Sequence, residues 1–166
     1  MTPEHAPHGG LRASVGLLTV SDTRSEATDA SGAEARRLLE GAGHRIGAYA
    51  ILPDEPARVS AQVKDWLRSA EIEAVVVNGG TGVSTRDRTY EALAEHLERP
   101  LPGFGELFRM LSFQEVGAAA MLSRAAGGIA SGKPVFVLPG STKAVTLALT
   151  RLILPALPHL LGELRR

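Results

Sequence analysis

Four short, nearly continuous apolar runs constrain the fold of this chain more than any other feature of its sequence. Runs of this kind are typical of parallel strands that are buried on both faces. Amphipathic helical patterns separate them, and alternating strands and helices predict right-handed crossovers and a doubly wound sheet. We therefore predict a three-layer α/β fold with a mostly parallel sheet and helices on both faces. The predicted strands are Val15–Val20, Gly47–Leu52, Ala74–Asn78 and Pro134–Leu138.

Caps and apolar spacing predict the helices between these strands. Ser31 and Glu34 have the spacing of a capping box, which predicts that the first helix begins at Ser31. Pro155 is expected to break the helix Thr142–Leu154, because proline lacks the backbone N–H that a helix interior needs, and a short helix is expected to follow. The stretch 112–133 fits a helix, a hairpin or both. The remaining predicted helices are one that follows Asp54, Tyr90–Leu97, Glu106–Leu111 and Thr142–Leu154.

Length and composition limit the classes of protein to consider. The 166 residues suffice for one compact domain, and 44% of them are apolar, as in globular proteins. We expect a flexible tail at residues 1–12 and a single domain at residues 13–166. The chain has no cysteine, which excludes thiolate metal ligands and fits a cytoplasmic location. Its 18 basic and 18 acidic side chains balance, and no uninterrupted apolar run has membrane-spanning length, so we expect neither nucleic-acid nor membrane partners.

Every predicted strand ends in polar residues or glycines. In open α/β sheets, ligands bind beyond the carboxyl ends of the strands. The four loops that follow the strands are therefore expected to meet at one edge of the sheet and to form a binding site there. They contain Ser21 and Asp22, Asp54 and Glu55, Gly79–Gly82, and Pro139–Lys143.

Two of these loops are suited to anions. Gly79–Gly82 lets a ligand approach the backbone closely and presents amide groups to anionic oxygens. Gly140 opens the last helix, whose free amides and dipole favour phosphate, and Lys143 can add positive charge. The alternatives are a tight turn that requires glycine for its dihedral angles and a solvated surface lysine.

Two aspartates lie at neighbouring strand ends. Asp54 and Asp87 each precede a predicted helix, so each can serve simply as an N-cap. Two carboxylates that act together can instead hold Mg²⁺, which in turn binds a triphosphate. Ser21 and Asp22 leave a similar choice between capping a turn and contacting a ligand.

Seven sequence blocks, in order along the chain, resemble the MoaB/MogA family of molybdenum cofactor biosynthesis proteins. A single Gly-Gly-Thr-Gly would be a weak signal, but seven ordered blocks between about residues 13 and 160 are a specific one. The MoaB branch is the more similar. The blocks are Thr19–Arg24, Asp29–Gly32, Leu52–Glu55, Asn78–Gly82 with Arg86–Thr89, Gly103–Glu106, Leu122–Arg124 and Leu138–Ala144.

The resemblance implies a reaction and a set of residues that carry it. The terminal phosphate of molybdopterin attacks the α-phosphorus of MgATP, adenylyl-molybdopterin forms and pyrophosphate leaves. Asp54 and Asp87 match the family positions linked to catalysis and to Mg²⁺. A homotrimer or homohexamer is implied as well. The substrate-binding residues that the resemblance implies are Ser21, Asp22, Gly79, Gly80, Thr81, Gly82, Ser123, Pro139, Gly140, Ser141 and Lys143.

Two alternatives to a molybdopterin adenylyltransferase stay open at this point. MogA-type members usually carry asparagine or glutamine where this chain has Ser141, which leaves room for a non-catalytic molybdopterin-binding or scaffold subunit. The other alternative is an unrelated binder of a phosphorylated ligand on the same α/β framework. The two aspartates favour the enzyme, because a pure binder of an anion gains nothing from added negative charge.

Overall fold

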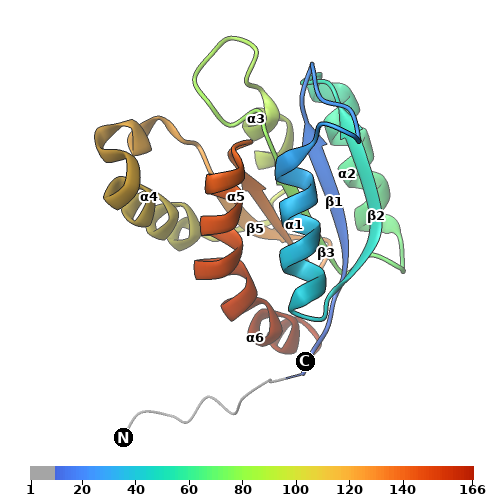
Figure 1. Ribbon diagram of the computed structural model, residues 1–166. Helices are drawn as coiled ribbons and strands as arrows, with labels where there is room; N and C mark the ends of the chain where they lie inside the picture. Colours follow the sequence, from blue (N-terminus) through green and yellow to red (C-terminus); the bar gives the residue numbers. More distant parts are fainter. Residues whose placement is uncertain (1–9) are drawn as a thin grey trace, which may run out of the picture.

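The chain folds into one sheet with helices on both of its faces, as the computed structural model in Figure 1 shows. The structure describes residues 10–166, so most of the predicted tail at residues 1–12 lies outside the described residues. Leu11 already packs against the core, and the Arg12 guanidinium donates to the carbonyl of Ala42. The predicted three-layer α/β class is confirmed.

The sheet has six strands in the order β2-β1-β3-β6-β5-β4. The four predicted strands form its parallel part, and the other two add an antiparallel edge. From β1 the chain first adds β2 on one side of the sheet and then returns to add β3 and β6 on the other side. The winding direction therefore switches between β1 and β3, and folds of this kind bind ligands at the carboxyl ends of the strands that flank such a switch. The strands are β1 (Ser14–Val20), β2 (Arg45–Leu52), β3 (Ala74–Asn78), β4 (Arg99–Pro100), β5 (Ala126–Ala130) and β6 (Lys133–Leu138).

The parallel strands are buried on both faces, which explains their continuous apolar runs. In β1, Val15 and Leu17 contribute to one core cluster, while Leu18 and Val20 contribute to the other. Helices α1, α4, α5 and α6 cover the first face, and α2 and α3 cover the second (Figure 1). The helices on the two faces are α1 (Ala30–Gly41), α2 (Pro56–Arg68), α3 (Thr89–Ala94), α4 (Pro102–Val116), α5 (Thr142–Ala148) and α6 (Leu154–Leu164).

The first helix begins one residue before the predicted start, and the predicted capping box does not form. Asp29 is the N-cap, and its Oδ1 accepts a hydrogen bond from the Gly32 N–H at 3.0 Å. The Ser31 hydroxyl is buried and donates instead to Asn78 Oδ1 at 2.8 Å. Spacing along the sequence does not reveal that Ser31 faces the sheet, so the capping prediction was wrong.

The stretch 112–133 contains both of the elements that its sequence allowed. The second half of α4 extends to Val116, and Gly117, with φ of +64°, ends it. A short 3₁₀ helix, η1 (Gly117–Leu122), follows, and the chain then enters the β5–β6 hairpin. This hairpin makes β5 the antiparallel neighbour of β6.

The predicted helix after Pro155 is present as α6, but the predicted break is wrong, because the helix continues through the proline. A π-helical segment, η2 (Leu149–Ile153), joins α5 to α6 directly before the proline. A wider turn at this point accommodates the missing N–H of the proline, and the helix axis bends there (Figure 1). The continuous helix Thr142–Leu164 is long and apolar enough, by length and composition alone, to cross a membrane; its residues Val145 and Leu157 pack in the core.

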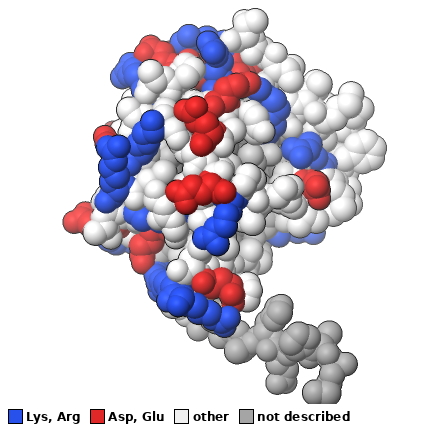
Figure 2. Space-filling view, turned by 180° about the vertical axis from the view of Figure 1, so that it is seen from behind, with Lys and Arg blue, Asp and Glu red and all other residues white. Residues whose placement is uncertain are grey.

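The face that carries α2 presents acidic and basic side chains interspersed, as Figure 2 shows. Ion pairs on α2 join Arg58 to Glu55 at 3.8 Å and Arg68 to Asp65 at 3.9 Å. Such mixed charge provides no continuous basic surface on this face for a nucleic-acid backbone.

Candidate functional site

A cavity of about 460 Å³ lies at the carboxyl ends of β1, β3 and β6. We call it the strand-end pocket. Three of the four loops that the strand-end argument predicted to meet line it, the loop after β2 does not, and most of the predicted substrate-binding residues belong to the lining. Its lining residues are Val20, Ser21, Thr23, Arg24, Gly79, Gly80, Thr81, Gly82, Asp87, Ser123, Pro139, Gly140 and Ser141.

The loop after β3 requires glycine at two successive positions. Gly79 has φ of +106° and Gly80 has φ of +68°, which are conformations that residues with side chains rarely adopt. A Cβ atom at Gly79 would lie 2.1 Å from the carbonyl oxygen of Val20. On the opposite side, a Cβ at Gly140 would lie 3.2 Å from the Gly79 Cα. The backbones of the two loops therefore approach each other and the pocket closely.

Asp54 lies beneath the glycine loop and not in the pocket lining. Its side chain is buried, with 6% of the residue exposed, and a Cβ at Gly80 would lie 2.5 Å from its Oδ2. The carboxylate accepts from the Arg88 N–H at 3.2 and 3.3 Å, so Asp54 does not cap α2. Burial raises the pKa of the Asp54 carboxyl above its ordinary value, and the negative charges of Asp87 and Asp22 raise it further against the Arg88 hydrogen bond.

Asp87 lines the pocket and stabilises the turn that leads into α3. Its Oδ2 accepts from the Ser84 N–H at 3.1 Å and from the Ser84 hydroxyl at 2.6 Å. The N-cap position of α3 belongs to Arg88 and not to Asp87. A Cβ at Gly82 would lie 2.7 Å from the same carboxylate oxygen, so this aspartate too is packed against the glycine loop.

Asp22 is held at the edge of the site by an arginine. Arg86 binds it with two hydrogen bonds, from Nε at 2.7 Å and from Nη2 at 2.8 Å. The backbone N–H of Asp54 also donates to Asp22 Oδ1 at 3.1 Å. The Arg86 hydrogen bond, together with the one from Asp54, lowers the pKa of the Asp22 carboxyl to about 2. Arg86 therefore already has an acidic partner within the chain.

The carboxylates of Asp54 and Asp87 offer the oxygen ligands that Mg²⁺ prefers. Near the Asp54 carboxylate lies the hydroxyl of Thr89, which is buried and has no hydrogen-bond partner among the described residues. A Cβ at Gly80 would touch both this hydroxyl and Asp54, so the unpaired hydroxyl and the carboxylate share one small region. No group of three or more Asp, Glu or His residues in residues 10–166 has the arrangement of a complete metal site. Two carboxylates suffice where Mg²⁺ takes its other ligands from water and substrate phosphates.

The loop after β6 combines a helix N-terminus with a glycine. Ser141 is the N-cap of α5, and its hydroxyl accepts from the Ala144 N–H at 3.1 Å. Gly140 lies beside it in the pocket lining, whereas Lys143 is exposed and is absent from that lining. The positive charge that the sequence suggested for this loop therefore comes from a different residue, Arg24.

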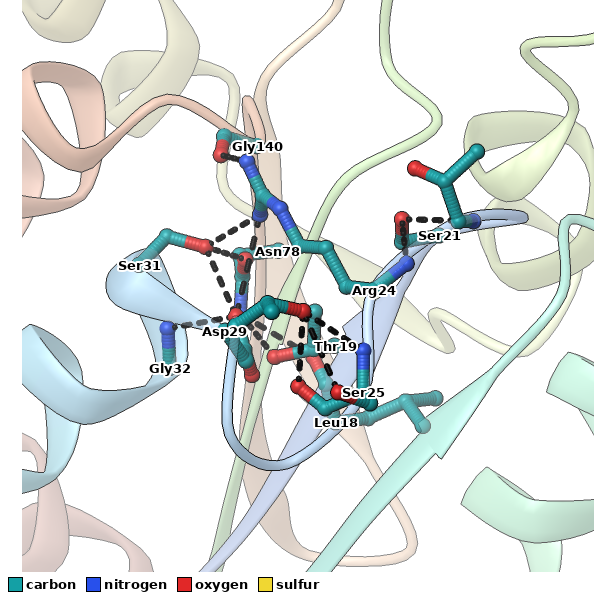
Figure 3. Close-up of polar contacts among 12 residues, drawn as sticks. Leu18, Thr19, Ser21, Arg24, Ser25, Asp29, Ser31, Gly32, Asn78 and Gly140 are labelled. Atoms are coloured by element: carbon teal, nitrogen blue, oxygen red, sulfur yellow. Dashed lines mark hydrogen bonds and ion pairs between the residues drawn. The ribbon is translucent and has the colours of Figure 1, made fainter.

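Arg24 was not among the predicted site residues, although it belongs to a block that resembles the family. Among the described residues that line the strand-end pocket, it is the only lysine or arginine. It lies between the Ser21 turn, the N-terminus of α1 and Gly140, as Figure 3 shows. Its partners are up to 116 residues away in the sequence, and no local spacing points to them.

The other predicted residues complete the pocket walls. Ser21 Oγ accepts from the backbone N–H groups of Thr23 and Arg24, at 3.3 and 3.1 Å, and so fixes the turn after β1. Thr81 is buried, and its carbonyl accepts from the Arg124 N–H at 3.1 Å. Ser123 lines the pocket from the segment before β5.

A second cavity of about 550 Å³ lies between α3, α4 and β5 and shares Ser123 with the strand-end pocket. Its two arginines are already bound to backbone oxygens. Arg109 Nη1 donates to the Ala125 carbonyl at 3.2 Å, and Arg124 Nη2 donates to the Asp87 carbonyl at 2.8 Å. The smaller strand-end pocket has the glycine backbone and the helix N-terminus that suit a phosphorylated ligand.

The fold and the strand-end pocket define a doubly wound α/β protein with a pocket suited to anions at the carboxyl ends of its strands. We call a pocket of this kind, built from glycine backbone and a helix N-terminus, an anion-type pocket. A family model described as "Probable molybdopterin binding domain" matches residues 16–159. The chain therefore belongs to the MoaB/MogA family of molybdenum cofactor biosynthesis proteins, and the resemblance seen in the sequence is confirmed.

Individual relatives agree with this assignment. The chain is 50% identical to molybdenum cofactor biosynthesis protein B of Halalkalibacterium halodurans over 149 residues, which are 89% of this chain and 88% of the relative. It is 46% identical to the protein of the same name from Bacillus subtilis over 151 residues, which are 90% and 89% of the two chains.

Solved structures of similar proteins have the same fold. A crystal structure of a molybdenum cofactor biosynthesis protein B has a TM-score of 0.91 at 44% identity, and the match covers 94% of this chain and 98% of that one. The tungsten cofactor synthesizing protein MoaB from Pyrococcus furiosus has a TM-score of 0.83 at 34% identity, with 93% and 98% covered.

Proposed function

We propose that this member of the molybdenum cofactor biosynthesis family adenylylates molybdopterin with MgATP. The observation that carries the proposal is the packing of two carboxylates against the glycine loop of an anion-type pocket. Asp54 lies against Gly80 and Asp87 against Gly82. A site for a bare anion is weakened by such charges, whereas a site for a metal-bound triphosphate requires them.

The proposed reaction is a single transfer at phosphorus. An oxygen of the terminal phosphate of molybdopterin forms a bond to the α-phosphorus of ATP, the bond between that phosphorus and the bridging oxygen breaks, and pyrophosphate leaves with the electron pair. No covalent intermediate with the protein is needed. The glycine amides and the N-terminus of α5 would hold the phosphates, and Asp54 and Asp87 would hold Mg²⁺, which neutralises charge on the triphosphate. The protein's contribution is positioning and charge compensation.

A pyrophosphate-release assay tests the proposal directly. Purified protein is mixed with molybdopterin, ATP and Mg²⁺, and release is followed with each component left out in turn. The proposal expects release only when all are present. Binding of molybdopterin without pyrophosphate release would instead support a non-catalytic binding or scaffold subunit. Two features of Ser141 favour that alternative: it caps a helix, and MogA-type members usually have asparagine or glutamine at its position. A preference for a sugar phosphate over molybdopterin would overturn the pterin assignment.

We further propose that the chain assembles as a homotrimer or homohexamer. The support is a group of large apolar side chains on α4 and η1 that are 48–75% exposed in the single chain. Exposing a contiguous apolar group to water is unfavourable, and such groups mark surfaces that a partner covers. Light scattering coupled to size-exclusion chromatography tests this, and a monomer at micromolar concentration would contradict it. The exposed side chains are Leu107, Met110, Phe113, Val116, Met121 and Leu122.

A cytoplasmic location and the lack of nucleic-acid and membrane partners stay predictions from the sequence. The interspersed charges of Figure 2 support the lack of a nucleic-acid partner on the face that the figure shows.

A further inference from the structure

Arg24 holds a position in the strand-end pocket that the proposed reaction does not yet explain. It follows the turn fixed by Ser21, whose hydroxyl accepts its backbone N–H at 3.1 Å. Its side chain is 31% exposed and belongs to the pocket lining. Apart from Arg24, the charged side chain in the described lining is that of Asp87, which is negative.

The guanidinium of Arg24 is fixed by three partners from two different segments. Nη1 donates to the Ser31 hydroxyl at 2.6 Å and lies 3.7 Å from Asp29 Oδ1, while Nη2 donates to the Gly140 carbonyl at 3.0 Å (Figure 3). The first two partners belong to the beginning of α1, and the third belongs to the loop before α5. The arginine thus has one defined position across the pocket.

The partners of Arg24 are themselves held by a buried network. Ser31 donates to Asn78 Oδ1 at 2.8 Å, and Asn78 Nδ2 donates to Thr19 Oγ1 at 3.0 Å. Burial alone would raise the pKa of the Asp29 carboxyl, but hydrogen bonds from Thr19, Tyr49 and Gly32 outweigh it and lower that pKa, so Asp29 stays negative. The network fixes the guanidinium before any ligand arrives, which lowers the entropic cost of binding.

The bonds of Arg24 leave part of its donor capacity free. A guanidinium has five N–H groups. The hydrogen bonds to Ser31 and Gly140 and the ion pair with Asp29 use at most three of them. The remaining donors belong to a partly exposed cation at an anion-type pocket, and the planar guanidinium matches phosphate oxygens in geometry.

We propose that Arg24 binds a phosphate group of the substrate in the strand-end pocket and thereby positions it between the glycine loop and the N-terminus of α5. The proposal rests on the proposed function in that the pocket receives phosphorylated ligands. The phosphate is that of the nucleotide or that of the pterin, and the experiment separates these two sources. A purely structural latch between the Ser21 turn and Gly140 is the competing explanation.

The experiment measures binding of three probes to the full-length protein by calorimetry: ATP with Mg²⁺, molybdopterin, and inorganic pyrophosphate. The variants are Arg24→Gln, Arg24→Lys and, as a matched control, Arg68→Gln, which makes the same change at an arginine that is 77% exposed on α2. For Arg24→Gln we expect at least about a tenfold loss of affinity for pyrophosphate and for one of the two substrates, the one whose phosphate Arg24 binds. Arg24→Lys keeps the charge and should recover part of that loss, and the control should bind as wild type.

Two readouts distinguish a ligand contact from a latch. Raising the salt concentration should weaken pyrophosphate binding less in Arg24→Gln than in wild type, because a charge contact has been removed. A latch predicts instead that both Arg24 variants lose thermal stability and lose affinity for every probe alike, without rescue by lysine. That pattern, or binding by Arg24→Gln within twofold of wild type, overturns the inference. If wild type binds pyrophosphate through Arg24 but never releases it from ATP and molybdopterin, the proposed enzyme activity fails while the role of Arg24 stands.

Discussion

Replacing Gly79 with alanine tests the geometry of the strand-end pocket at its most constrained point. Two costs arise from the structure. Alanine must adopt φ of +106°, which is unfavourable by about 1–3 kcal/mol for a residue with a side chain. Its Cβ must also lie 2.1 Å from the Val20 carbonyl oxygen, and relieving such an overlap costs about 1–3 kcal/mol. The clashing atom is backbone in β1, so a side-chain rotation cannot remove it.

One term opposes these costs. Alanine restricts the unfolded chain more than glycine does, which stabilises the folded protein by about 0.4–1 kcal/mol. The net expectation is that the free energy of unfolding falls by about 1–6 kcal/mol. For a domain of this size, that corresponds to a fall in Tm of about 2–24 °C.

Equilibrium unfolding in urea measures the effect, with the fluorescence of Trp66 as the signal. Trp66 is the single tryptophan of the chain and is 7% exposed in the fold. Gly41→Ala is the matched control, because a Cβ at Gly41 meets no atom within 4 Å. The control should be as stable as wild type or more stable by up to about 1 kcal/mol. A Gly79→Ala protein within about 0.5 kcal/mol of wild type, the range of ordinary surface changes, would refute the close approach of the loop to β1.

Three further predictions concern the carboxylates of the fold. Asp54→Asn and Asp87→Asn should each reduce pyrophosphate release far more than molybdopterin affinity, and normal turnover at limiting Mg²⁺ would contradict the assigned metal role. The pKa of Asp22 is about 2 in the folded protein, below its ordinary value of 3.8. Its contribution to stability is therefore present above about pH 4 and is lost as the pH falls toward 2. The stability of Asp22→Asn should accordingly depend less on pH over this interval than the stability of wild type, as acid unfolding can measure. Tyr49→Phe removes the 2.6 Å hydrogen bond to buried Asp29 and should lower the free energy of unfolding by about 1.5–3 kcal/mol in urea titrations, whereas an unchanged midpoint would show that the bond adds nothing.

The parallel strands were predictable because their burial leaves a direct trace in the sequence. A strand covered on both faces is apolar at nearly every position, and Ala74–Asn78, which is apolar up to the buried Asn78, was predicted with its observed bounds. The stretch 112–133 leaves no comparable trace. Apolar residues such as Phe113 and Val116 are exposed on α4, and Gly127 and Gly128 occupy a buried strand, so neither the helix nor the hairpin has a regular pattern there.

The site was predictable to the extent that it follows strand ends. That rule located the glycine loop, Asp87 and Gly140 in one pocket. It could not tell which positive side chain enters it, and it suggested Lys143, which is exposed, instead of Arg24. The difference depends on a hydrogen bond between Arg24 and Gly140, which are distant in sequence and whose contact exists only in the folded chain.

The wide separation in sequence of the segments that form the pocket has a consequence for the order of events during folding. The lining runs from Val20 to Ser141, and Gly79 donates its N–H to the carbonyl of Leu138 at the end of β6. A nascent chain that has not yet added β6 to the sheet therefore lacks the binding site, however well its first three strands have assembled. A ligand that binds only the completed site stabilises the finished fold alone, so bound substrate would protect the mature protein without trapping a partly folded one.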